Sequence, residues 1–430
     1  MHLKHASRRT TLEPVTLTDL RPDLGAGRHD GYRHGERGHR QISAALFAAG
    51  VATFALLYST QALLPEFTSS FGVGADGATW SLSLTTIGLG VTLLFAGSLS
   101  ELVGRTRLIH WSVLTSSLVG LLCALAPTWS ALLGLRLVQG ILLAGMPAVA
   151  MAYLREELHP STHARAAGLY IGGNALGGMA GRLLTGAIGE VAGWRWALAS
   201  VALLGVCCAV VVRITLPDSR NFERAAHSAR GLLAGLAAAL REPGLLALYG
   251  IGACAMGAFV AVYNSLGFRL TDAPFDLSLG AAGLVFLVYP IGSLSSALAG
   301  RLTESLGRRG VVPLGCVVTI AGAVITLSDN LLLVVVGLAV MTAGFFAVHG
   351  VASGWVPGRA HAAGVPAGQA ASCYLLAYYA GSSVFGTLSG AAWSGRGWGG
   401  VVALAGGLTV AAILLAAYLW RTPSLVPGLR

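Results

Sequence analysis

The chain has 430 residues, of which 55% are hydrophobic and only 11% are charged, and its mean hydropathy is +0.71. Soluble domains carry about 25% charged residues, so this composition excludes an ordinary soluble protein and indicates a membrane protein with many spans. The net charge of +10 does not indicate a nucleic-acid partner, because the basic residues follow the predicted membrane topology described below.

Residues 1–42 are polar, with scattered arginine and histidine. They lack the apolar segment of a cleavable signal peptide, so we interpret them as a disordered cytoplasmic tail. The six cysteines lie in apolar stretches without the spacing of metal or disulfide sites, and we expect no cofactor. Lys4 is the only lysine, which excludes a phosphate-binding loop of the type that needs glycine followed by lysine. We therefore expect no enzymatic activity.

Twelve apolar stretches follow, each predicted to cross a bilayer. Helices are expected because an open sheet cannot span lipid and barrel strands give weak alternating patterns. The polar stretch 217–244 predicts an amphipathic helix on the membrane surface. It divides an all-α membrane protein into six-helix bundles at 43–216 and 245–420, with a cytoplasmic tail at 421–430. The predicted spans are 43–66, 80–102, 107–126, 129–154, 164–190, 194–216, 245–268, 280–302, 311–327, 331–355, 365–391 and 398–420.

A short phrase occurs twice, as GSLSELVGRTR at 97–107 and as GRLTESLGRRG at 300–310. Both copies fall between the second and third spans of their half, which indicates an internal duplication. We expect the two halves to be parallel repeats related by a pseudo-two-fold axis, with a central cavity between them. The shared positions are Gly97, Glu101, Gly104 and Arg105 in the first copy, and Gly300, Glu304, Gly307 and Arg308 in the second.

The duplicated acid predicts a conformational latch. Glu101 and Glu304 end spans at the cytoplasmic surface, where each could accept hydrogen bonds from a helix N-terminus of the other half. Such contacts, near Pro366 for Glu101 and near Arg165 for Glu304, could form only while the cytoplasmic side is closed. The alternative is that the neighbouring arginines merely fix the topology.

Charge placement predicts the orientation. With both termini inside, the cytoplasmic segments hold 23 of the 28 Lys and Arg residues. The opposite loops hold Arg195, Arg269 and Arg396, and two more arginines lie within spans. This asymmetry follows the positive-inside rule.

The two arginines within spans are Arg136 and Arg182. A charge in the hydrocarbon costs about 2.5–3.5 kcal/mol, so each must face a cavity or a partner. Gln139 lies one helical turn after Arg136, and Asn174 shares a helix face with Arg182. For Arg136 the alternative is a structural role, with hydrogen bonds to backbone carbonyls.

Few titratable groups lie within the membrane, because no Asp or Glu lies in the middle of a span. Glu66, at the outer end of the first span, could pair with Arg136 or be an interfacial loop carboxylate. His349 lies within span 331–355, and imidazole exchanges a proton near neutral pH. It is either a proton carrier or a hydrogen-bonded packing histidine.

Polar and aromatic side chains are scattered through the otherwise apolar spans. Such a mixture is typical of a pocket for an amphipathic ligand, although interfacial anchoring or helix packing would use the same residues. They are Tyr58, Gln61, Tyr263, Asn264, Tyr289, Tyr374 and Tyr378. The glycines between 168 and 189 predict close approach of span 164–190 to another helix, either as a sliding contact between the halves or as a tight helix pair.

These motifs together resemble the major facilitator superfamily over residues 43–420. The repeated phrase is similar to its signature between spans 2 and 3, RLVQG at 136–140 to its span-4 motif, and GGNALGGMAGRLLTG at 172–186 to its antiporter-associated span-5 motif. With GWRWALA at 193–199, the chain looks most like a bacterial drug-efflux-like branch of proton-coupled exporters. The resemblance implies a role for Arg136 in proton coupling or cavity electrostatics.

The sequence therefore predicts a monomeric secondary transporter in the bacterial inner membrane, with both termini cytoplasmic. Its expected partners are a small amphipathic substrate, protons and the lipid bilayer. The two buried arginines favour an anionic or neutral substrate over a cation. Proton-coupled efflux is the first hypothesis; the alternatives are a symporter that imports a sugar or organic acid, and a membrane sensor or enzyme without transport.

Overall fold

The computed structural model describes residues 30–222 and 229–422. Most of the predicted tails at 1–42 and 421–430 lies outside these ranges. Within them the chain is helical, and its one β-bridge, between Tyr32 and Leu158, is isolated. The structure is therefore of the predicted all-α class.

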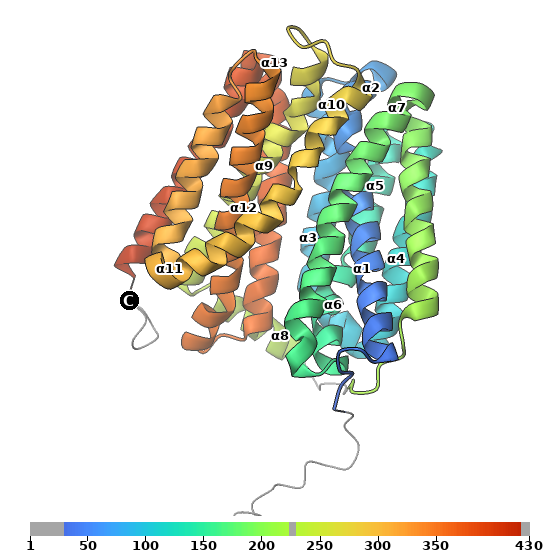
Figure 1. Ribbon diagram of the computed structural model, residues 1–430, viewed down its shortest axis with the longest axis vertical. Coiled ribbons are helices and arrows are strands. Elements are labelled where there is room, and N and C mark those ends of the chain that lie inside the picture. Colours follow the sequence, from blue (N-terminus) through green and yellow to red (C-terminus); the bar gives the residue numbers. More distant parts are fainter. Residues whose placement is uncertain (1–29, 223–228, 423–430) are drawn as a thin grey trace, which may run out of the picture.

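Nine helical segments of the described residues are long and apolar enough to cross a membrane. Three of these segments contain a break at which the chain reverses, so each forms a hairpin of two crossings (Figure 1). The twelve predicted crossings result. The breaks are at Gly193 in α7 (His163–Thr215), at Gly307 in α11 (Pro290–Ile325) and at Arg396–Gly397 in α13 (Ala367–Arg421). All three glycines have positive φ, which costs glycine little.

The first six crossings form one bundle. Its elements are α1 (Arg37–Tyr58), η1 (Gln61–Leu63), α2 (Leu64–Phe71), α3 (Ala75–Val103), α4 (Arg105–Ala124), α5 (Trp129–Leu143), α6 (Gly145–Glu157), η2 (Pro160–Thr162) and α7. Order begins earlier than the sequence predicts. The backbone of Tyr32 donates to Glu157 (2.9 Å) and accepts from His159 (3.1 Å), which holds the chain against the end of α6 before α1 begins.

The second bundle repeats the arrangement. Its elements are α9 (Pro243–Thr271), α10 (Leu279–Gly283), η3 (Leu284–Val288), α11, α12 (Leu331–Ala362) and α13. Helix α8 (Ala229–Ala239) lies in the segment between the bundles, within the stretch for which an amphipathic helix is predicted.

Figure 1 shows the two bundles side by side, the first in blue to green and the second in yellow to red. We call the end at which α1 begins and α11 turns at Gly307 the lower face, and the end at which α7 turns at Gly193 the upper face. Helices α7 and α10 meet near the upper face, whereas α7 and α11 diverge toward the lower face.

Glycines of α7 bring this helix into close backbone contact with two other helices. In α7, an added Cβ on Gly173, Gly177 or Gly181 would lie only 2.2–2.6 Å from a backbone oxygen of α1. The glycine stripe therefore makes a tight pair within the first bundle. Nearer the upper face, Gly186 of α7 approaches Leu279 and Gly283 of α10, in the other bundle.

Candidate functional site: the cavity between the bundles

A cavity of about 750 Å³ lies between the two bundles. Its walls come from both, including Tyr58 of α1, Arg182 of α7, Tyr289 beside α11 and His349 of α12. Exposed residues in the lower part of α7, such as Gly172, also line it. The cavity is thus continuous with the surface on the lower side.

Hydrogen bonds between the bundles close the upper side. Near the middle of the molecule, Thr86 of α3 bonds Ser383 of α13 (2.7 Å), and Thr387 donates to Ser83 (2.9 Å). At the upper face, Glu190 Oε2 accepts from the Ser278 hydroxyl (2.8 Å) and from the Gly280 N–H (2.7 Å). Glu190 at the end of one α7 arm therefore caps the start of α10.

Arg182 is the charged residue at the centre of the cavity wall, and it is 1% exposed. Its Nε donates to Gln61 (2.5 Å) and its Nη1 to the Gly178 carbonyl (2.6 Å). Among the described residues no carboxylate pairs with it. Three aromatic rings surround the guanidinium instead, with Cζ to centroid distances of 4.1 Å for Tyr58, 4.5 Å for Tyr289 and 5.0 Å for Phe286. The negative faces of such rings stabilise a cation.

A polar chain connects Arg182 to the second bundle. Gln61, which accepts from Arg182, donates through Nε2 to Asn264 Oδ1 (2.7 Å). Gln61 and Asn264 are buried and lie behind the cavity wall. Tyr263 also lies behind it, against the ring of Tyr289 (5.2 Å), and its hydroxyl bonds Thr342 (2.7 Å).

His349 lies on the opposite wall among aromatic side chains. Its Nδ1 is 3.0 Å from the Tyr374 hydroxyl, and its ring lies 4.6 Å from that of Tyr378 and 5.9 Å from that of Phe345. Phe345 in turn stacks on Phe259 at 4.1 Å. This wall offers flat apolar surface with a few hydrogen-bonding groups, as ligand pockets do.

Arg136 belongs to a different cluster, inside the first bundle. Its guanidinium donates to the carbonyls of Leu57 (2.8 Å), Leu56 (3.0 Å) and Ser81 (3.0 Å) and to Gln139 Oε1 (2.5 Å). Gln139 in turn donates through Nε2 to the Ser116 carbonyl (3.0 Å). The cluster binds the carbonyl end of α1 and is not part of the cavity wall.

The suggested pair of Glu66 with Arg136 is wrong. Glu66 Oε1 accepts the backbone N–H of Trp194 (2.8 Å), directly after the break at Gly193. Glu66 therefore caps the start of the second arm of α7, near the upper face, whereas Arg136 bonds deeper in the bundle. Its other oxygen, Oε2, is buried without a hydrogen-bond partner among the described residues.

The repeated phrases lie at the turns of the lower face. Gly104 and Gly307 have φ of 97° and 68° and form the reversals. Glu101 accepts from Arg105 (2.6 Å), which also binds Glu156 of α6 (2.9 Å). Glu304 is exposed, Gly97 and Gly300 have open space around them, and Arg308 lies near Gly358. The latch thus remains a prediction for a state in which the lower side is closed.

Another ion pair lies at the lower face. Its acidic partner, Glu242, precedes α9 and lies outside the membrane-spanning segments. Glu242 caps α9 by accepting from the Leu245 N–H (2.5 Å), and it binds Arg359 of α12 (2.6 Å). Burial alone would raise the pKa of the Glu242 carboxyl. The hydrogen bonds from Arg359 and from the backbone of Leu245 and Gly244 outweigh this and hold the pKa below its usual value.

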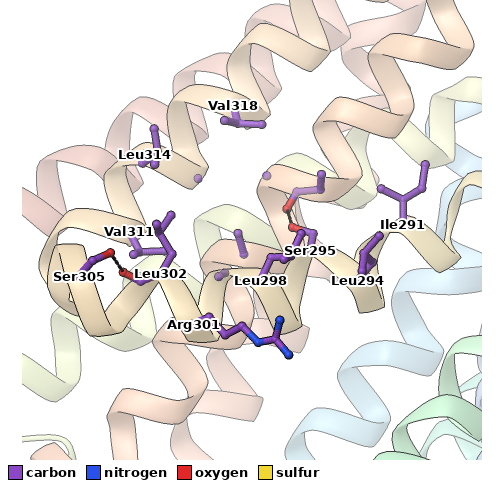
Figure 2. Close-up of a pocket in the computed structure, with 15 residues that line it drawn as sticks. Ile291, Leu294, Ser295, Leu298, Arg301, Leu302, Ser305, Val311, Leu314 and Val318 are labelled. Atoms are coloured by element: carbon purple, nitrogen blue, oxygen red, sulfur yellow. Dashed lines mark hydrogen bonds between the residues drawn. The ribbon is translucent and has the colours of Figure 1, made fainter.

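Another hollow, of about 580 Å³, lies between the two arms of α11 and α12 (Figure 2). Its walls are mainly aliphatic, and Leu294 and Leu298 are more than half exposed. Its Ser295 hydroxyl already donates to the Ala343 carbonyl, and Arg301 lies at its lower end. With so few free polar groups it is a poor candidate for specific recognition.

The cavity therefore brings together six of the predicted residues, which are Tyr58, Asn174, Arg182, Tyr289, His349 and Tyr378. The Oδ1 of Asn174 lies against Gly50 of α1 and is buried without a hydrogen-bond partner among the described residues. Sequence reasoning missed Phe286 and Glu190. Part of the signal for the Glu190 contact is in the sequence. Ser278 before an apolar run is a typical helix N-cap, and it marks the start of the helix that Glu190 contacts. In the described ranges, no group of three or more His, Cys, Asp or Glu residues is placed to hold a metal.

Twelve crossings in two bundles around a shared cavity define the class of the protein as a multi-pass membrane transporter. The family model described as Major Facilitator Superfamily matches residues 46–296. An uncharacterized MFS-type transporter of Bacillus subtilis, YybF, is 40% identical over 391 residues, which are 91% of this chain and 96% of the relative. The chain belongs to the Major Facilitator Superfamily, whose members transport small molecules.

Other comparisons agree. The inner membrane transport protein YnfM of Escherichia coli is 38% identical over 415 residues, covering 96% of this chain and 99% of the relative. Among solved structures, a bacterial homologue of the human lysosomal transporter Spinster has a TM-score of 0.69 at 16% identity, covering 90% of this chain and 97% of that one. The nucleoside transporter NupG has a TM-score of 0.68 at 16% identity, with coverages of 88% and 99%. These structures are similar in fold.

Proposed function

We propose that this transporter exports a small amphipathic molecule in exchange for protons, without covalent chemistry, by alternating access. The observation that carries the proposal is the central cavity, which both bundles line, which reaches the lower surface and which cross-bundle hydrogen bonds close from above. A substrate enters from below, and rocking of the bundles then exposes it above. The protein acts as a monomer because one chain supplies the whole cavity.

The lower face is proposed to be cytoplasmic. The Lys and Arg residues concentrate in segments that end there, whereas the upper loops hold Arg195, Arg269 and Arg396. Arg269 is neutralised by Asp329 at 2.6 Å. The positive-inside rule therefore supports a cytoplasmic location for both termini, and the name of the E. coli relative supports the inner membrane of a bacterium.

Export and proton coupling are supported by the similarity of residues 172–186 to the antiporter-associated motif. Two titratable groups are suited to carry the proton. His349 lies on the cavity wall, and Glu66 has a carboxylate oxygen buried without a partner among the described residues near the upper face. When the bundles rock, Glu190 releases α10, and the predicted latch contacts of Glu101 and Glu304 can form below.

The test uses inverted membrane vesicles whose interior is acidified by respiration. The probes are 2-naphthalenesulfonate, 2-naphthamide and (2-naphthylmethyl)trimethylammonium, which share one ring system and do not themselves carry protons across the membrane. We expect addition of a transported probe to release the pH gradient, measured with a fluorescent weak base, as the probe accumulates inside. Vesicles without the protein should show neither accumulation of the probe nor release of the pH gradient. The Arg301→Gln variant, which is altered outside the cavity, should show both accumulation and release. Accumulation without gradient release, or uptake by intact cells with external alkalinisation, would contradict proton-coupled export.

A further inference from the structure

The charge of Arg182 faces the cavity without a balancing carboxylate. Its guanidinium uses Nε and Nη1 for Gln61 and the Gly178 carbonyl, both neutral. The remaining nitrogen, Nη2, has no acceptor among the described residues, and the rings of Tyr58, Tyr289 and Phe286 supply only partial compensation. A buried cation with a free donor attracts an anion strongly, because little water screens it.

A second polar group lies beside it. Tyr289 lines the cavity and is only 7% exposed. Its hydroxyl is buried and has no hydrogen-bond partner in the described part of the chain. Its ring contacts the guanidinium (4.5 Å). A buried hydroxyl without a partner is costly, so a ligand atom that accepts from both Tyr289 and Arg182 would satisfy two groups at once.

The rest of the cavity wall is suited to an apolar or aromatic body. Phe259 and Phe345 stack at 4.1 Å, and His349 and Tyr378 continue this surface. None of the residues that line the cavity is Asp or Glu. A cation would therefore meet Arg182 without any acid to hold it.

We propose that the cavity binds an amphipathic anion, with its negative group on Arg182 Nη2 and the Tyr289 hydroxyl and its apolar part on the Phe259–Phe345 wall. This rests on the proposed function in that it assigns the substrate class of the same cavity. Carboxylate, sulfonate and phosphate groups offer the same acceptor oxygens.

Equilibrium binding of the three naphthalene probes to the purified full-length protein in detergent tests the assignment. We expect 2-naphthalenesulfonate to bind about 10- to 100-fold more tightly than 2-naphthamide, as for a hydrogen bond to a charged group, and the trimethylammonium probe to bind more weakly than both. Arg182→Gln should abolish the preference for the sulfonate. Arg301→Gln, which removes one positive charge away from the cavity, should leave the preference unchanged.

A smaller change keeps the test decisive if Arg182→Gln does not fold. Tyr289→Phe removes one hydroxyl and retains the ring, so we expect a several-fold loss for the sulfonate and none for the amide. Tightest binding of the cation, or equal binding of the sulfonate by the parent and both variants, would overturn the assignment. Anion binding without proton-coupled export would contradict only the proposed function, and proton-coupled export of the cation would contradict only the anion site.

Discussion

Arg136 and Arg182 are buried to the same extent, at 1% exposure each, but their surroundings differ. Arg136 is surrounded by acceptors, with the carbonyls of Leu56 and Leu57 at the end of α1 and the amide oxygen of Gln139. Arg182 is surrounded by ring faces and keeps one nitrogen free of protein acceptors among the described residues. A saturated guanidinium holds helices together, whereas an unsaturated one is available to a ligand.

Arg136→Gln should therefore reduce stability. Hydrogen bonds to a charged group are each worth about 1.5–3 kcal/mol, and glutamine cannot replace them all. We expect Tm in detergent to fall by about 5–10 °C, with Arg136→Lys in between. Binding of the naphthalene probes by the folded fraction should change less than two-fold, because Arg136 does not line the cavity. Unchanged Tm with loss of proton exchange would instead support the coupling role implied by the family resemblance.

Glu242 makes stability depend on pH in the acid range. Because its folded pKa is lowered by Arg359 and the backbone of α9, the ionised form stabilises the fold above the unfolded pKa of about 4.3, and this contribution is lost as pH falls through the folded pKa. Glu242→Gln should lower Tm by a few degrees between pH 5 and 8, and the difference should shrink as pH falls below about 4.3 and vanish only once pH is below the folded pKa. A difference in Tm that stays constant down to pH 3.5 would exclude the ion pair as its source.

At the scale of elements, the sequence predicts where helices cross the membrane but not which side of each faces inward. Apolar runs and glycines mark the crossings and turns, including Gly104 and Gly307. Along a span, however, lipid-facing and protein-facing positions are both apolar, so the rotation of the helix leaves little trace in composition. This explains why Glu66 and Arg136 are incorrectly paired from the sequence: it does not reveal that Glu66 points toward Trp194.

The contact of α7 with α10 is the clearest cross-bundle closure at the upper face. Glu190 accepts from Ser278 and from the Gly280 N–H at the start of α10, where a carboxylate also benefits from the helix dipole. Gly283 of α10 is buried against Gly186 just inside this contact, and an added Cβ there would meet its nearest atom at 3.6 Å. A cysteine at Gly283 thus fits and reports on opening.

Glu190→Gln should weaken the contact of α7 with α10, so that the upper side is open in a larger fraction of molecules. We expect a membrane-impermeant maleimide to label Gly283→Cys about 2- to 5-fold faster in the Glu190→Gln background, as for a loss of about 0.3–1 kcal/mol. The native cysteines are first replaced by alanine. Asp329→Asn, which alters an upper-face carboxylate that pairs with Arg269 within the second bundle, is the matched comparison and should change the rate less. Equal rates with and without the Glu190 carboxylate would show that it does not hold the upper side closed.

For the whole molecule, the duplication and the charge asymmetry predict two bundles, while the cavity is predicted only in part. Arg182 and Tyr58 are predicted because a charge or a hydroxyl in an apolar span needs a partner. Phe286 is missed because a phenylalanine in an apolar run is indistinguishable from packing. Its contact with Arg182 joins α7 to η3 across the bundles, and such a contact depends on how the halves dock rather than on either sequence alone.

The proposed orientation predicts opposite labelling at two glycines with open surroundings. Gly172 is exposed on the cavity wall toward the lower side, and Gly395 is exposed at the upper turn of α13; an added Cβ would meet no atom within 4 Å at either. In a background without native cysteines, an impermeant maleimide should label Gly395→Cys in spheroplasts and Gly172→Cys in inverted vesicles. A transported probe should protect Gly172→Cys and leave Gly395→Cys unaffected, because only the former lines the cavity. The reverse sidedness would place the lower face outside the cell, and the cavity would then load from outside, as an importer requires.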